Sequence, residues 1–263
     1  SDTFFSTTNY FAGITHTVLG FATKRSESDF VGFHMFYMDS GDMKVTTVEH
    51  PDGQGEMFNV TAFSLRGIYT KILTDRLKIG VAVKYIREQI HTTYMQSFVV
   101  DLGSNFDTGI YGMILGMSVS NFGPQVEYHG EGLEVPVDSE LVPDETLSRV
   151  TTEFYLPMTF RLGLKNDIIG SNSALFSNFD PSHKLTLALD GINALDYTVY
   201  FTMGLEYGWK DMAFARFGTH LGHDTAGISA GFGLKYRGIN MDYAYVNYGP
   251  LEETHQFGIG LGF

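Results

Sequence analysis

The 263-residue chain contains no cysteine, so neither disulfide bonds nor thiolate chemistry contribute to its fold or function. It also lacks any run of about 18 apolar residues, and its mean hydropathy is −0.04, so it is not a helical membrane protein. Basic residues are scarce, with 17 Lys and Arg against 30 Asp and Glu, which leaves a net charge of −13. That balance argues against a nucleic-acid partner, because such partners are held by cationic contacts to phosphate.

The motifs of several enzyme classes are missing as well. Neither a G-x-x-x-x-G-K-[ST] phosphate loop nor a G-x-S-x-G nucleophile elbow occurs. His220 and His223 stand beside Asp224, but with no third defined ligand a solvated turn is a better interpretation than a metal site. Histidines and carboxylates are numerous enough for a Ser/His or Asp/His pair, which the sequence alone places nowhere. We predict a protein that is not an enzyme and that has no cofactor and no metal site.

Glycine and aromatic residues are abundant instead, and apolar residues recur with a period of two. Between Thr225 and Tyr236 the even positions are apolar, whereas the odd positions are glycine, serine, threonine or lysine. In a strand these two sets point to opposite faces. The same split occurs in 77–85, 111–119, 158–164 and 197–207. The glycine-dense stretch from Gly227 to Gly233 is therefore interpreted as strand positions facing a lumen rather than as a nucleotide cradle.

The length of these segments favours a membrane barrel over a soluble sandwich. Most run about 9–11 residues, which a tilted strand needs to cross a bilayer. Aromatic residues stand at segment ends, as an interfacial girdle requires: Tyr85, Tyr111, Tyr197, Tyr207, Trp209 and Tyr236. The pattern predicts fourteen strands, near 2–8, 10–24, 28–38, 58–73, 77–88, 92–104, 110–121, 156–167, 183–190, 196–208, 211–220, 225–236, 239–248 and 254–263. We expect one all-β domain, a transmembrane antiparallel β-barrel over residues 1–263.

The last segment supports the same fold. Phe257, Ile259, Leu261 and Phe263 alternate with three glycines. A terminal amphipathic strand that ends in phenylalanine resembles the C-terminal signal of outer-membrane barrels. If Phe263 lies at the periplasmic side, strand parity places short turns in the periplasm and the two longest connections outside, apart from the long periplasmic segment 168–182. Short periplasmic turns with long external loops are the rule for such barrels.

The two long external connections, 39–57 and 122–155, are acidic. Their net charges are −4 and −7, so together they carry −11 of the total of −13. The candidate partner-binding residues in them are Asp39, Asp42, Glu49, Asp52, Glu56, Glu127, Glu131, Glu134, Asp138, Glu140, Asp144 and Glu145. Two interpretations remain open: solvation of exposed loops, or a docking surface for a basic protein partner or a divalent cation.

A second candidate group lies on the polar faces of the strands. Lys84, Arg161, Lys235 and Asp242 are expected to face the lumen. They form either a network of ion pairs that stabilises the barrel or a path, or plug contact, for an anionic ligand. The lumen predicted here is largely glycine and charge, which disfavours a long-chain lipid as its cargo.

Several stretches resemble the PorV/PorQ family of outer-membrane proteins over nearly the whole chain. They are FFSTTNYFAGI (4–14), MDSGDMKVTT (38–47), GQGEMF (53–58), LTDRLKIGVAVKYIREQI (73–90), SNFGP (120–124), LPMTFRLGL (156–164) and MDYAYVNYGPLEETHQFGIGLGF (241–263). The resemblance implies a fourteen-stranded barrel related to the FadL fatty-acid channels. Family members usually carry an N-terminal segment with an Asn-Pro-Ala-type motif that plugs the lumen. That motif is absent here, so the resemblance leaves the state of the lumen open.

The resemblance also implies a function. PorV-like proteins bind the C-terminal domains of cargo in type IX secretion and associate with the translocon and the attachment machinery, whereas PorQ-like proteins are partners of surface assembly factors. The sequence therefore predicts an accessory protein of secretion in the bacterial outer membrane, surrounded by lipid and holding protein partners through its external loops. The alternatives are a FadL-like channel for hydrophobic small molecules and a structural subunit of an envelope complex.

Overall fold

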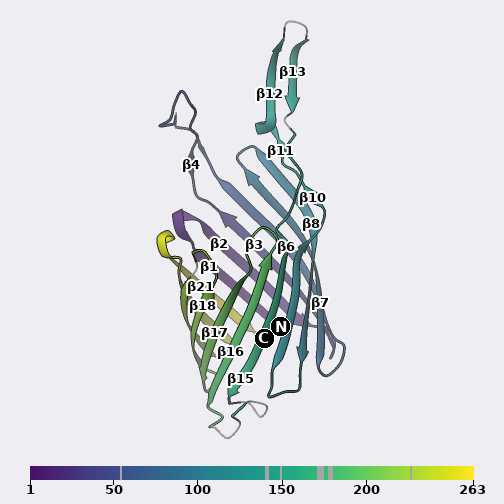
Figure 1. The fold of residues 1–263 in the computed structure, drawn as a ribbon, viewed down its shortest axis with the longest axis vertical. Coiled ribbons are helices and arrows are strands. Elements are labelled where there is room, and N and C mark those ends of the chain that lie inside the picture. Colours follow the sequence, from purple (N-terminus) through teal and green to yellow (C-terminus); the bar gives the residue numbers. More distant parts are fainter. Residues whose placement is uncertain (54, 140–141, 149, 171–174, 177–179, 226) are drawn as a thin grey trace.

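A computed structural model describes residues 1–53, 55–139, 142–148, 150–170, 175–176, 180–225 and 227–263, with only the backbone described for 135–148. Within these residues, fourteen long strands form one closed antiparallel sheet (Figure 1). The strands are β1 (Asp2–Asn9), β2 (Thr15–Lys24), β3 (Asp29–Asp39), β6 (Val60–Ile72), β7 (Leu77–Ile90), β8 (Thr93–Asp107), β9 (Ile114–Phe122), β15 (Thr159–Ile169), β16 (His183–Ala194), β17 (Tyr200–Trp209), β18 (Ala213–Leu221), β19 (Ile228–Tyr236), β20 (Ile239–Asn247) and β21 (Glu253–Gly262). The predicted barrel of fourteen strands is confirmed.

The barrel closes through the two ends of the chain. Strand β1 pairs with β21 from Asp2 opposite Gly262 to Asn9 opposite His255. Every other long strand pairs with the long strands that come directly before and after it in the chain. Each long strand therefore has a partner on both sides, so the sheet exposes no unpaired backbone edge to lipid. Among the described residues, no helix is long and apolar enough to cross a membrane.

Several strands begin later than the sequence predicts, and for two of them backbone geometry gives the reason. The strand expected from residue 10 starts at Thr15, because a 3₁₀ turn at Phe11–Gly13 places Ala12 at φ 56° and Gly13 at φ 77°. The strand expected from residue 110 starts at Ile114, after a turn in which Tyr111 has φ 47°. Left-handed residues break a strand, and alternation of side chains does not reveal them.

The register places the apolar phase of the strands outside and the small or polar phase inside. On β7, for example, Val81 and Val83 face outward, whereas Gly80 and Lys84 face the lumen. Large apolar side chains remain solvent-exposed on the outer wall, as a lipid-facing surface requires: Phe5, Leu19, Phe33, Leu102, Leu162, Met203, Phe217, Phe232 and Ile259 are among them. The predicted assignment of the two faces is confirmed.

The connections differ at the two ends of the barrel. One end carries short turns and the segment 170–182, whereas the other carries the long connections 40–59 and 123–158. The first long connection includes a ribbon of β4 (Met43–Lys44) and β5 (Met57–Phe58). The second includes β10 (Gln125–Val126), β11 (His129–Gly130), β12 (Glu134–Ser139), β13 (Val142–Ser148) and β14 (Phe154–Tyr155). The β12–β13 ribbon projects beyond the barrel end (Figure 1).

Candidate functional site

The lumen contains cavities of about 720, 370 and 330 Å³, and the largest of these three surrounds a pair of salt bridges. Small residues form much of its wall, and Arg216 of β18 crosses its floor. The Nε atom of Arg216 lies 2.7 Å from Oε2 of Glu206, and its Nη1 atom lies 2.6 Å from Oδ1 of Asp242. To reach Asp242 on β20, the guanidinium passes over β19, where a Cβ atom on Gly233 would lie 2.7 Å from Oδ1 of Asp242. Glycine on the lumen face of β19 thus makes room for the ion pair.

A second polar cluster is more deeply buried. The Nζ atom of Lys84, whose side chain is 7% exposed, lies 3.4 Å from Oδ1 of Asp101. Nη2 of Arg66 lies 3.0 Å from the other carboxylate oxygen of Asp101. One carboxylate on β8 therefore joins the cations of β6 and β7 across three neighbouring strands.

The same cluster holds a β-bulge in β9. Between the pairs Val100–Phe122 and Leu102–Val119, Asp101 faces both Ser120 and Asn121. Asn121 has φ 63°, and its backbone N–H donates to Oδ1 of Asp101 at 2.8 Å. Lys84 donates to the Asn121 side-chain oxygen, and the Asn121 amide donates to the carbonyl of Pro157 at 2.8 Å. The cluster thus fixes where β9 leaves the regular sheet.

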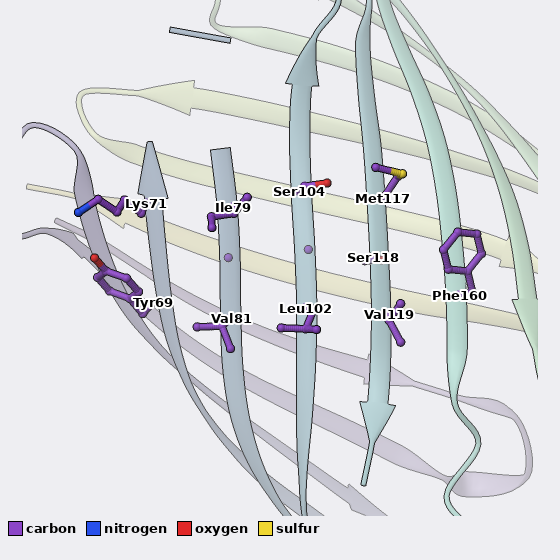
Figure 2. A pocket seen from close by; sticks show the side chains of 12 residues that line it. Tyr69, Lys71, Ile79, Val81, Leu102, Ser104, Met117, Ser118, Val119 and Phe160 are labelled. Carbon is purple, nitrogen blue, oxygen red and sulfur yellow. The ribbon is translucent and has the colours of Figure 1, made fainter. Parts of the chain in front are cut away.

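An apolar depression of about 430 Å³ lies on the outer wall, and Val119, which precedes the bulge, is one of the residues that line it (Figure 2). Outward side chains of adjacent strands line it, among them Ile79 and Val81 of β7, Leu102 of β8, and Met117 and Val119 of β9. A lumen cavity of about 330 Å³ lies behind the same strands. Six residues line both spaces: Ile79, Gly80, Gly103, Ser104, Met117 and Ser118. Only the thickness of the sheet separates the apolar depression from the lumen.

An apolar cap covers the inner face of β7 and β8 at the end that carries the long connections. Val126 of β10 and Leu156, just after β14, pack against Met95 and Val99, which share the lumen-facing phase of β8 with Asp101. Val99 is 1% exposed and Leu156 is 8% exposed. The polar contact that accompanies this packing runs from the Tyr128 hydroxyl to the Glu88 carboxylate. Burial and this hydrogen bond raise the pKa of Tyr128 far above its ordinary value.

The lumen is less uniformly polar than the sequence predicts. Strands β2, β3 and β6 present Val18, Phe36 and Ile68 to the inside, because these residues share the register phase of Ser6, His34 and Arg66. Phe4 of β1 also lines the largest cavity. The expectation that the lumen is glycine and charge therefore does not hold throughout, because in this sector large apolar side chains share the lumen face with polar ones such as His34 and Arg66.

The four predicted lumen residues all face inward, but they belong to separate groups. Lys84 joins Asp101, Asp242 joins Arg216, and Nζ of Lys235 lies 3.0 Å from Oδ2 of Asp211 at a short turn. Arg161 has no ion pair within the described residues and lines the 330 Å³ cavity. Sequence reasoning missed the partners Asp101, Asn121 and Arg216. The alternation places Asp101 and Arg216 on the lumen face, but the register between strands is needed to pair them.

The predicted acidic loop residues lie at the end with the long connections. Asp39 ends β3 and accepts the Gly41 N–H at 2.8 Å, and Glu127 lies 3.6 Å from His129. Asp42, Glu49, Asp52 and Glu56 belong to the exposed 40–59 connection or its margins, and Glu131 and Glu134 to the 123–158 connection. Glu140 and the side chains of Asp138, Asp144 and Glu145 lie outside the described residues. Over the described part of the chain, no group of three His, Asp or Glu residues is placed to hold a metal ion.

His220 and His223, considered above for metal binding, belong to an aromatic group instead. Their ring centroids lie 5.7 Å apart, and the His223 ring lies 5.1 Å from Tyr200 and 5.4 Å from Tyr197. These contacts join the connection after β16 to the connection after β18.

No protein-family model matches the chain, and no curated protein matches it in sequence. Solved barrels do match its structure. The CymD monoaromatic hydrocarbon channel matches with a TM-score of 0.56 at 10% identity, over 99% of this chain and 86% of that one. The Ralstonia pickettii toluene transporter TbuX gives 0.53 at 9% identity, over 99% and 87%. The Acinetobacter baumannii outer membrane protein Omp33 gives 0.50 at 7% identity, over 100% and 97%. At such identities the similarity shows the fold.

The closed sheet, the apolar outer wall and these neighbours define an outer-membrane β-barrel. The expected fold class, an antiparallel FadL-like transmembrane barrel, is confirmed, and so is the location in the bacterial outer membrane. Of the three neighbours, one is described as a channel and one as a transporter, and none as an enzyme. Membership of the PorV/PorQ family stays a prediction.

Proposed function

We propose that this barrel is an outer-membrane channel for small hydrophobic molecules. The observation that carries the proposal is the apolar depression on the lipid-facing wall, which backs directly onto a lumen cavity at Gly80 and Gly103. A hydrophobic molecule that leaves the aqueous lumen for this depression, or for the lipid around it, is stabilised because transfer out of water is favourable. The cavities, at about 330 and 720 Å³, lie within the roughly 300–1,000 Å³ of small-molecule sites.

Two further features support the channel. The inner faces of β2, β3 and β6 give the lumen an apolar sector, with Val18, Phe36 and Ile68. The fold neighbours include a monoaromatic hydrocarbon channel and a toluene transporter. These neighbours favour the channel over the secretion function that the sequence resemblance implies.

The test is uptake of radiolabelled toluene by bacterial cells that express the barrel, since their outer membrane slows unaided entry. In Gly103→Leu the new side chain enters the lumen cavity, and its Cβ lies 3.6 Å from the nearest backbone atom, so the barrel folds. Uptake should fall to the level of cells without the protein. Gly20→Leu is the matched control, because Gly20 faces the lumen on β2 and does not line the 330 Å³ cavity, with its Cβ 3.8 Å from Phe4. Equal uptake by both variants and the wild type would contradict the proposal.

A second candidate is the secretion role implied by the PorV/PorQ resemblance. It is favoured by the two long acidic connections, which lie at one end of the barrel, and by the projecting β12–β13 ribbon. Deletion of 134–148 should leave the barrel folded but abolish recovery of protein partners from mild-detergent extracts. If the same partners are recovered without the ribbon, it is not their docking surface.

A further inference from the structure

The 330 Å³ lumen cavity carries an unbalanced positive charge. Ten of its lining residues face the lumen, and three of these are charged: Lys78 of β7, Arg161 of β15 and Asp190 of β16. Two cations therefore surround one carboxylate. The adjoining cavity of about 370 Å³ shares Lys78 and Asp190 and is balanced in charge, because it adds Arg76 and Lys165 together with Asp75 and Asp107. The excess of positive charge is therefore confined to the 330 Å³ cavity.

Several other lumen cations form ion pairs, unlike the cations of this cavity. Lys84, Lys184 and Arg216 each lie within 3.4 Å of a carboxylate oxygen. For the side chains of Lys78 and Arg161, by contrast, no ion pair or hydrogen bond exists within the described residues.

Asp190 does not neutralise them. A Cβ atom on Gly163 would lie 2.2 Å from Oδ1 of Asp190, so this carboxylate rests on the bare backbone of Gly163. Its other oxygen accepts a hydrogen bond from Thr202 at 3.4 Å. The Arg161 guanidinium faces the cavity, and its parallel N–H donors can bind a carboxylate through two hydrogen bonds.

The rest of the lumen-facing wall of this cavity consists of glycines and of the short polar side chains of Thr70, Asn105 and Ser118. Gly80, Gly103, Gly116 and Gly163 contribute backbone without side chains on four strands. These small residues leave space for a planar ring, and the volume of the cavity lies near the lower end of the small-molecule range.

We propose that this cavity binds a one-ring aromatic monocarboxylate, with the ring against the glycine wall and the carboxylate at Arg161 and Lys78. The inference rests on the proposed channel function and adds a preferred substrate class to it, a hydrophobic acid alongside neutral hydrocarbons. The apolar depression behind the same strands suits the ring of such a molecule, and the lumen cations suit its acid group.

The test compares two ligands of nearly the same shape, phenylacetate and phenylacetamide, by titration calorimetry on the purified barrel at neutral pH. Phenylacetate should bind at least roughly tenfold more tightly, because a hydrogen bond to a charged group is stronger than one to a neutral group. The double variant Lys78→Gln/Arg161→Gln should remove that preference while phenylacetamide binding stays unchanged. High salt should weaken the preference in the wild type.

Lys235→Gln is the matched control, since it removes a lumen cation that is already paired with Asp211. It should keep the full preference for phenylacetate. Equal binding of the two ligands by the wild type, or an unchanged preference in the double variant, overturns the inference. Toluene uptake separates the two proposals: if toluene enters cells but phenylacetate does not bind, only the acid specificity is wrong. If toluene does not enter cells and phenylacetate does not bind, the channel proposal fails as well.

Discussion

The apolar cap makes a quantitative prediction about the external end of the barrel. Leu156 anchors the 123–158 connection by packing against Met95 and Val99 on the inner face of β8. Leu156→Ala removes buried methyl groups and leaves a cavity, a change that costs about 2–5 kcal/mol in protein cores. The cap is small and lies near the surface, so the lower part of that range, about 2–3 kcal/mol, applies.

This loss should open the cap without unfolding the barrel. The long strands keep all their pairings, and the connection has only short ladders of its own, such as the two residue pairs of β10 and β14. At 1.4 kcal/mol per factor of ten, opening becomes roughly 30- to 140-fold more frequent. Local openings of this kind are measured by hydrogen exchange.

The assay is hydrogen exchange with mass spectrometry on the protein in detergent micelles. Backbone amides in 123–130 and 151–158 should exchange faster in Leu156→Ala by the stated factor, whereas β16 to β19 should not change. Leu195→Ala is the control, because Leu195 is 67% exposed in another external connection and its loss should cost less than about 0.5 kcal/mol. Unchanged protection of the 123–158 peptides in Leu156→Ala would refute the packing argument.

Three further predictions concern polar groups. Asp101→Asn leaves two largely buried cations without their carboxylate and should lower the free energy of unfolding by about 3–5 kcal/mol. Asp211→Asn removes one partner of an exposed pair and should lower it by less than about 1 kcal/mol. Urea titration of the barrel in lipid vesicles measures both changes. Gly233→Ala places a Cβ atom 2.7 Å from a carboxylate oxygen and should lower the free energy of unfolding by about 1–3 kcal/mol in the same assay. Gly204→Ala is the control and should be tolerated, because its Cβ atom would lie 3.9 Å from the nearest neighbouring atom. The Ser182 N–H donates a hydrogen bond to the Asp180 carboxylate and holds the pKa of Asp180 below its ordinary value. This hydrogen bond therefore stabilises the turn fully at a pH above the ordinary carboxyl pKa, and the contribution is lost as the pH falls through the lowered pKa of Asp180. An NMR titration that gives Asp180 a pKa at or above the ordinary carboxyl value would contradict this.

Much of the fold follows from the sequence because the side chains alternate strictly in the later strands. From β16 to β21 one face is apolar and the other is small or polar, so both the strands and their orientation are predictable. The strands β2 and β3 are harder to predict from the sequence, since Val18 and Phe36 place apolar side chains on the lumen face as well. There the period of two weakens, and the apolar sector of the lumen is visible only in the register.

The candidate site is less predictable than the fold. Alternation identifies Lys84 and Asp242 as lumen residues, but their partners lie on other strands, far along the chain. The bulge at Asn121 and the cavities behind the outer wall depend on backbone geometry, of which the sequence shows only an Asn-Phe-Gly-Pro stretch after a strand.

The most direct test of the channel is a crystal structure of the barrel soaked with bromobenzene, in which anomalous scattering locates the bromine. The channel account predicts one bromine peak in the wall depression beside Met117 and Phe160 and a second in the lumen cavity beside Gly103. Bromine at neither place, with peaks confined to the detergent belt elsewhere on the outer wall, would contradict it.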